Sequence, residues 1–179
     1  MTITKMLFLR TISMYFGTIM GLFWIVKFAF LILGFSMPLL QLMFLFLTLM
    51  VPVMGYLLTK RYREVYCFKE ISFRHAFVFN ILMYTFAALL AGMGHFIYFR
   101  FIDKGFLFDK YSETLETFKA TLPAGMDTES LTESLSIISS LTPMQLTFQL
   151  MAQNFFYCTI IALFTALMTK KVNKNNTTN

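Results

Sequence analysis

Charged residues are scarce in this 179-residue chain: Asp, Glu, Lys and Arg together make up 13% of it, whereas they make up about a quarter of a soluble globular domain. Hydrophobic residues make up 58%. This balance excludes an ordinary water-soluble domain and indicates a chain that is surrounded mostly by lipid. The length is that of one domain, so we expect a single membrane domain over residues 1–179.

Cysteine and histidine are also rare. The two cysteines, Cys67 and Cys158, give no disulfide framework and no zinc spacing. The two histidines, His75 and His95, have no second metal-type ligand near them in the sequence. We also find no nucleophile with its base, no glycine-rich phosphate loop, no paired carboxylates inside an apolar run and no internal repeat. We therefore expect no cofactor, no metal and no enzymatic activity.

Four long apolar runs are present instead. About 20 apolar residues cross a bilayer as a helix, so each run predicts one span. The first run is longer than the apolar part of a signal peptide, and we interpret it as an uncleaved span. The expected fold class is all-α, an integral membrane four-helix bundle. The predicted spans are about 11–33, 37–59, 76–99 and 143–169.

Local signals mark where two of the spans begin. Ser36 follows a tight turn at Gly34 and is the expected N-cap of the second span, with Pro38 in its first turn. Thr142 precedes Pro143, and Gln145 stands three residues after Thr142. This order predicts a capping box at the start of the fourth span.

Two helix faces are expected to meet other helices. Ser13, Gly17 and Gly21 form a ridge of small residues at spacing four, which lets helix backbones approach closely in lipid. We favour packing within the chain over a seam between two copies. On the third span, polar and small residues share one face, with Phe79 elsewhere. That face comprises Asn80, Tyr84, Ala87, Ala88, Ala91, His95 and Tyr98.

The composition changes over residues 103–142, where seven Asp and Glu outnumber three Lys. Helical spacing of apolar residues predicts an extracytoplasmic amphipathic helical hairpin, broken at Pro123, with Ser130 or Asp127 as the second N-cap. It is expected either to dock a partner or lipid, or to cover the outer ends of the spans. The Asn- and Thr-rich tail at about 172–179 is predicted to be disordered.

The distribution of positive charge predicts the orientation of the chain. Ten Lys and Arg lie in the N-terminal segment, the 60–74 segment and the C-terminal segment. The positive-inside rule then places both termini in the cytoplasm. A formal charge of +6 raises nucleic acid as a partner. Because these cations flank apolar spans, we expect no nucleic acid. The expected partners are the lipid bilayer and either another membrane protein or a second copy of the chain.

Four residues make a candidate intramembrane polar cluster. Lys27, His95, Gln149 and Gln153 come from three predicted spans, all in the expected outer half of the membrane. Ionisable residues inside spans are functional candidates, and a converging set would bind a small anion. The alternative is a set of interhelical hydrogen bonds, each worth about 0.6 kcal/mol. We expect a membrane component that acts through protein or lipid contacts, and a small transporter or channel is the alternative.

The pattern as a whole resembles a known family. The features are four spans, the segment from Phe68 to Phe73, an acidic helical segment with Gly125, Met126 and Glu129, and a last span ending in Lys170-Lys171. Together they resemble an uncharacterised bacterial inner-membrane family, domain of unknown function 4199. The resemblance implies a multi-pass protein of the bacterial inner (cytoplasmic) membrane, and it implies no activity and no functional residues.

Overall fold

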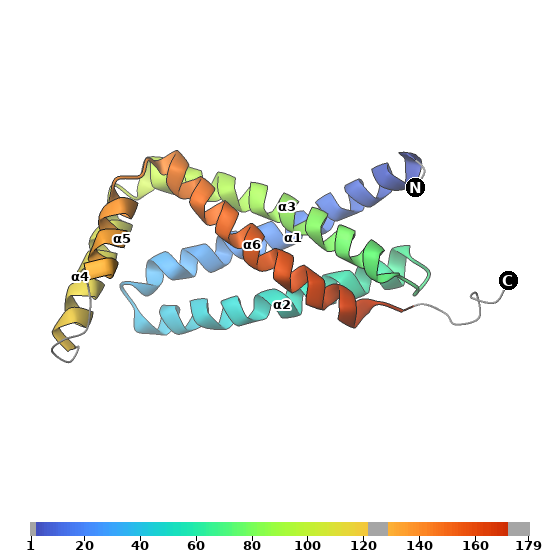
Figure 1. The fold of residues 1–179 in the computed structure, drawn as a ribbon, viewed down its shortest axis with the longest axis horizontal. Helices are drawn as coiled ribbons and strands as arrows, with labels where there is room; N and C mark the ends of the chain where they lie inside the picture. The colour runs from blue at the N-terminus through green and yellow to red at the C-terminus, as the bar shows by residue number, and fades with distance from the viewer. Residues whose placement is uncertain (1–2, 122–128, 172–179) are drawn as a thin grey trace. The chain divides into compact units, whose positions relative to one another are not determined.

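The computed structural model describes residues 3–121 and 129–171 of the chain. The predicted all-α fold class is confirmed, because the described residues form helices and no strand. In chain order these are α1 (Ile3–Gly34), α2 (Pro38–Tyr66), α3 (Phe73–Ile97) with the π-helical η1 (Tyr98–Ile102), α4 (Phe106–Thr121), α5 (Glu129–Ser139) and α6 (Pro143–Thr169) (Figure 1).

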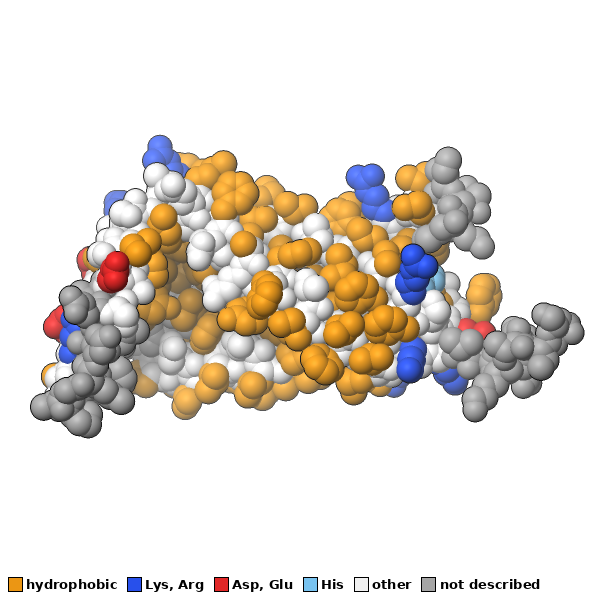
Figure 2. Space-filling model, in the orientation of Figure 1, with side chains coloured by type: hydrophobic (Ala, Val, Ile, Leu, Met, Phe, Trp, Pro, Cys, Tyr) orange, Lys and Arg blue, Asp and Glu red, His pale blue; other side chains and the backbone are white. Residues whose placement is uncertain are grey.

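Within the described residues, four helices are long and apolar enough to cross a membrane: Met6–Gly34, Pro38–Tyr66, Phe73–Ile102 and Pro143–Thr169. Hydrophobic side chains cover much of the visible surface of these helices (Figure 2), and Leu39 on α2, for example, is 71% exposed. Such a surface would be costly in water, whereas lipid is its natural surrounding. The chain is therefore a multi-pass membrane protein.

The chain forms two compact units. The first unit contains Met1–Ala91 and Met151–Asn179, and the second contains Gly92–Leu150. The first unit thus holds α1, α2, most of α3 and most of α6. The second unit holds η1, α4 and α5 together with the adjoining turns of α3 and α6.

The start of α6 follows the predicted capping box. The Thr142 backbone N–H donates to Gln145 Oε1 at 2.8 Å, and the Gln145 N–H donates to Thr142 Oγ1 at 3.3 Å. These bonds satisfy donors that a helix N-terminus leaves without an intrahelical partner. The prediction is confirmed, and α6 begins at Pro143.

The prediction of Ser36 as the N-cap of α2 is wrong. Met37 has the extended N-cap conformation and Pro38 is the first helical residue, without a side-chain cap. At its other end α2 continues to Tyr66, beyond the predicted span of about 37–59, so the charged residues from Lys60 to Arg63 are helical. The segment from Lys60 to Tyr66 contains no Gly or Pro, and Lys, Arg and Glu all favour helix.

Helix α3 is the most buried span. Half of its apolar window is buried, against 22–28% for the other three spans. Asn80, Tyr84 and Ala87 on the predicted inward face are each 0–1% exposed. Phe79, which the sequence analysis placed off this face, is also fully buried, and its ring stacks on Tyr62 at a centroid distance of 3.9 Å. The buried face of α3 is therefore wider than the polar stripe indicated.

The ridge of small residues on α1 packs against α3. A Cβ added to Gly17 would lie 2.6 Å from Phe86 Cβ and 2.7 Å from the Met83 carbonyl oxygen. A Cβ added to Gly21 would lie 3.1 Å from the Ala87 carbonyl oxygen. The preference for packing within the chain is thus confirmed, because a backbone contact this close requires glycine on one side.

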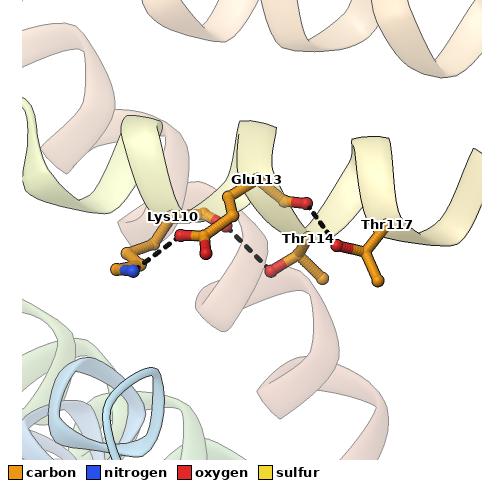
Figure 3. A network of polar contacts seen from close by, with 4 residues as sticks. All are labelled: Lys110, Glu113, Thr114 and Thr117. Atoms are coloured by element: carbon orange, nitrogen blue, oxygen red, sulfur yellow. Dashed lines mark hydrogen bonds and ion pairs between the residues drawn. The ribbon is translucent and has the colours of Figure 1, made fainter.

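In the second unit, Asp103 caps the start of α4. Its carboxylate accepts the N–H of Leu107 at 3.0 Å and of Gly105 at 3.2 Å. On the outer surface of α4, Lys110 Nζ lies 2.6 Å from Glu113 Oε2, and two threonine hydroxyls bond carbonyls one turn earlier (Figure 3). The Glu113 side chain is 67% exposed, so this face of α4 is solvated. Exposed pairs of this kind add little to the free energy of unfolding.

One of the two N-caps predicted for the second helix of the hairpin, Ser130, is wrong. Helix α5 begins at Glu129, so Ser130 is inside it and is not its N-cap. Asp127 and Pro123 lie outside the described residues, as does the tail from residue 172. Ile137 and Ile138 on α5 are 56% and 47% exposed. Apolar surface on α5 therefore remains uncovered within the second unit.

Candidate functional site

The four residues of the candidate polar cluster are divided between the two units. Lys27 and Gln153 belong to the first unit, and His95 and Gln149 belong to the second. Gln149 and Gln153 are both exposed on α6. Across the described residues, no hydrogen bond links Lys27 with Gln153. Lys27 and His95 are therefore described one at a time, each within its own unit.

Lys27 is half-buried on α1, and its ammonium lies over the ring of Phe44 on α2, 5.8 Å from the ring centroid. A cation–π contact contributes about 0.5–2 kcal/mol, with the larger values at desolvated sites. Lys27 thus lies against a side chain of α2, and the aromatic face of Phe44 partly compensates its cation.

His95 is buried, 4% exposed, in the last turn of α3. Directly after this turn the backbone changes to the π-helix η1, where the Asp103 N–H donates to the Tyr98 carbonyl at 2.9 Å. π-Helical turns within α-helices are frequent at functional sites. A π-helical turn thus follows the buried His95 directly.

A buried polar contact joins α2 and α3 in the first unit. The Thr59 hydroxyl lies 2.7 Å from the Gly55 carbonyl oxygen and 2.8 Å from Asn80 Oδ1, and it shares its proton between these acceptors. The Asn80 side-chain amide donates to the Ala76 carbonyl at 2.8 Å. Thr59 and Asn80 are both 0% exposed. Sequence reasoning identified the face of Asn80 but missed Thr59, whose only signal is its place one turn after Gly55.

One turn after Thr59, Tyr62 of α2 packs against His75 and Phe79 of α3. The Tyr62 hydroxyl and His75 Nε2 share a hydrogen bond of 2.9 Å, and Tyr62 stacks on Phe79. The adjacent Cys67 interacts with the Tyr62 hydroxyl, but burial outweighs this bond and raises the pKa of the Cys67 thiol. A thiol with a raised pKa is mostly protonated at neutral pH and is a poor nucleophile. These residues are suited to holding α2 and α3 together.

The connection between α2 and α3 contains a strained turn. The Glu70 N–H donates to the Cys67 carbonyl at 2.9 Å, and the two central residues, Phe68 and Lys69, have φ values of 50° and 66°. L-residues adopt this region at a cost of about 1–2 kcal/mol each, and Gly or Asn usually occupies it. Phe68 is 95% exposed. Sequence reasoning missed the turn because no Gly or Asn marks it.

The same connection is tied to the end of α6. Ile71 and Lys171 exchange two backbone hydrogen bonds, each 2.9 Å long. Arg63 Nη1 donates to the Thr169 carbonyl at 3.0 Å, where a helix C-terminus leaves carbonyls without intrahelical donors. In Figure 1 the ends of α2 and α6 and the start of α3 lie side by side. The end of α6 thus joins the α2–α3 connection, which is about one hundred residues away in the sequence, at one end of the first unit.

The chemistry available to these residues is hydrogen bonding, packing and charge. Within residues 3–121 and 129–171, no three His, Cys, Asp or Glu side chains come together as a metal site requires.

The model of a protein family described as "Protein of unknown function (DUF4199)" matches residues 15–171. No curated protein and no solved structure matches the chain.

Proposed function

The chain belongs to the DUF4199 family, and from this premise we propose that it is a non-enzymatic component of a bacterial inner membrane, acting through contacts with other proteins or with lipid. The observation that carries the proposal is how the first unit distributes its polar and apolar groups. Two inward-facing polar side chains, Thr59 and Asn80, bond each other, whereas most of the large side chains exposed along the spans are apolar.

The inward faces support a scaffold role. Thr59 and Asn80 use their hydrogen-bonding groups on each other and on backbone carbonyls of their own helices. Gly55 allows α3 to approach α2, because a Cβ there would collide with the Tyr84 hydroxyl. Contacts this close fix helices in place and leave the outward surfaces for recognition. The exposed Ile137 and Ile138 of α5 offer one such surface outside the spans.

We place both termini and the α2–α3 connection in the cytoplasm. The positive-inside rule favours this orientation, and the joining of the α2–α3 connection to Lys171 is compatible with it. A periplasm-dependent reporter enzyme fused after residue 179 should be inactive. The same reporter inserted at residue 124 should be active. Activity of the terminal fusion would contradict the orientation.

The contact role is tested by affinity purification of the full chain in mild detergent. A stoichiometric partner should be recovered reproducibly, and the double variant Ile137→Glu, Ile138→Glu should lose a partner that docks on α5. Ser136→Glu with Ser140→Glu is the matched control, because it adds the same charge at neighbouring exposed positions. Repeated recovery of the chain without any partner or retained lipid would refute the contact role.

The alternative is a small transporter or channel. The half-buried Lys27 inside a span motivates it, because ionisable residues there are functional candidates. His95, Gln149 and Gln153 would be the other polar residues on the route. Solute flux in liposomes that is lost in Lys27→Ala and His95→Ala would favour the alternative. Absence of flux across a broad panel of solutes would remove it.

A further inference from the structure

We propose that the end of the first unit where α2 and α6 stop binds the headgroups of anionic phospholipids. This deepens the contact role proposed above and rests on it, because it names lipid as one of the contacts. We call this site the basic end. Its cationic residues are Lys60, Arg61, Lys69, Arg74, Lys170 and Lys171.

The basic end is held in one arrangement although its residues come from distant parts of the sequence. The two backbone hydrogen bonds between Ile71 and Lys171 fix the end of α6 beside the α2–α3 connection. The bond from Arg63 to the Thr169 carbonyl adds a second tie. Figure 2 shows Lys and Arg side chains gathered at the side of the view where these helices end. The cations therefore form a shared surface.

The charge of this surface is largely uncompensated. All of its cationic side chains are exposed except Lys60, which is half-exposed. The segment has two carboxylates, of which Glu64 pairs with Arg63 at 3.5 Å and the other is Glu70. Clusters of this kind beside membrane spans attract anionic lipids. The complementary partner is thus a surface rich in phosphate.

Helix length places the basic end at headgroup level. Helix α2 has 29 residues and α6 has 27. At 1.5 Å per residue these are about 43 Å and about 40 Å long, close to the 40–45 Å of a bilayer that includes its headgroup layers. The last turns of both helices therefore lie among lipid headgroups, where phosphates are the nearest anions.

Phe68 adds an apolar contact to the charged ones. Two successive left-handed residues turn the chain so that this ring is 95% exposed. An exposed ring beside cations is typical of segments that bind at the boundary between headgroups and acyl chains. Nucleic acid and an acidic protein are less suited, because they would have to displace the phosphates that already surround this end.

The test uses tryptophan as a reporter at position 68. Trp24 is the single tryptophan of the chain, so the variant Trp24→Phe, Phe68→Trp reports only from the basic end. It is reconstituted in vesicles of phosphatidylglycerol and phosphatidylcholine in which one lipid or the other is brominated. Bromine quenches an indole that it touches. Brominated phosphatidylglycerol should quench at least twofold more than brominated phosphatidylcholine at equal fractions, and the difference should shrink as salt is raised.

Matched charge removals identify the residues responsible. The triple variant Lys69→Gln, Lys170→Gln, Lys171→Gln should bring the ratio of quenching by brominated phosphatidylglycerol to quenching by brominated phosphatidylcholine close to one. The control removes three lysines of the second unit, Lys104, Lys110 and Lys119, and should leave the preference unchanged. Circular dichroism and a single elution peak establish that each variant is folded.

Equal quenching by both lipids at low salt would overturn the proposal, as would co-purified nucleic acid or acidic protein that competes for the basic end. Should the Trp variant fail to fold, native mass spectrometry of the unaltered chain decides. Retention of phosphatidylglycerol over phosphatidylcholine is expected, and equal retention refutes the site. The vesicles contain no other protein, so a missing protein partner would leave the lipid preference intact.

Discussion

Helix α1 meets α3 at Gly17 without room for a side chain, and Gly17→Ala tests that contact. The added methyl carbon would lie 2.6 Å from Phe86 Cβ and 2.7 Å from the Met83 carbonyl oxygen, whereas carbon atoms in contact are about 3.5–4.0 Å apart. The helices must therefore separate by roughly 1 Å. Overpacking costs about 1–3 kcal/mol, and replacing Gly by Ala inside a helix returns about 0.5–1 kcal/mol. We expect a net loss of about 0.5–2 kcal/mol.

The free energy of unfolding is measured by titrating SDS into mixed micelles of the purified chain. Gly21→Ala is the graded comparison: its Cβ would lie 3.0–3.1 Å from α3 atoms, one of them the end of the Leu90 side chain. We expect a net change near zero there. Ala29→Leu, at an exposed position of α1, is the control. Unchanged stability of Gly17→Ala would refute the packing, and a lost dimer with unchanged monomer stability would indicate a seam between copies.

Three further predictions concern the α2–α3 connection and its surroundings. Thr59→Val and Asn80→Leu in a double-mutant cycle should show a coupling of about 0.6 kcal/mol in the free energy of unfolding, and strict additivity would refute the buried bond. Arg63→Gln should speed hydrogen–deuterium exchange at the end of α6, where the guanidinium holds a carbonyl, whereas Glu64→Gln should not; equal exchange would contradict this. Burial raises the pKa of Cys67, so less thiolate is present at pH 8 than in an unfolded chain. Alkylation of Cys67 by maleimide should therefore be slower in the folded protein than in the unfolded chain. Its rate should keep rising at pH values where the rate of a free thiol has levelled off. Equal rates for the folded and unfolded chain would exclude the raised pKa.

Local features of the chain were predictable from sequence. The spans were predictable because a helix that crosses lipid needs a long apolar run, whichever helices it packs against. The start of α6 was predictable because the side chains of Thr142 and Gln145, three residues apart, accept each other's backbone N–H groups. The ridge at Gly17 was also recognisable, since small residues at spacing four leave one helix face flat.

Features that depend on how one helix is rotated against another were not predictable. The pairing of Thr59 with Asn80 and the stacking of Tyr62 on Phe79 require the mutual rotation of α2 and α3, which neither segment encodes alone. Depth in the membrane was the only criterion that grouped Gln153 with Lys27, and depth does not determine which side of a helix faces inward.

Other features were missed because the sequence carries no signal for them. The left-handed turn at Phe68 lacks the usual Gly or Asn. The bridge between Ile71 and Lys171 joins residues one hundred positions apart. The predicted span ended before Lys60 because charged residues indicate where a helix leaves the membrane. The helix itself extends beyond that point, to Tyr66.

The central place of α3 has a consequence for biogenesis. Spans leave the insertion machinery in chain order, so α1 and α2 enter lipid before the helix that covers their glycines exists. Until α3 arrives, the backbone at Gly17 faces acyl chains or α2. The Thr59 hydroxyl then has the Gly55 carbonyl of its own helix but not Asn80. Delayed release of the third span would therefore leave a half-built intermediate that membrane proteases and chaperones can recognise.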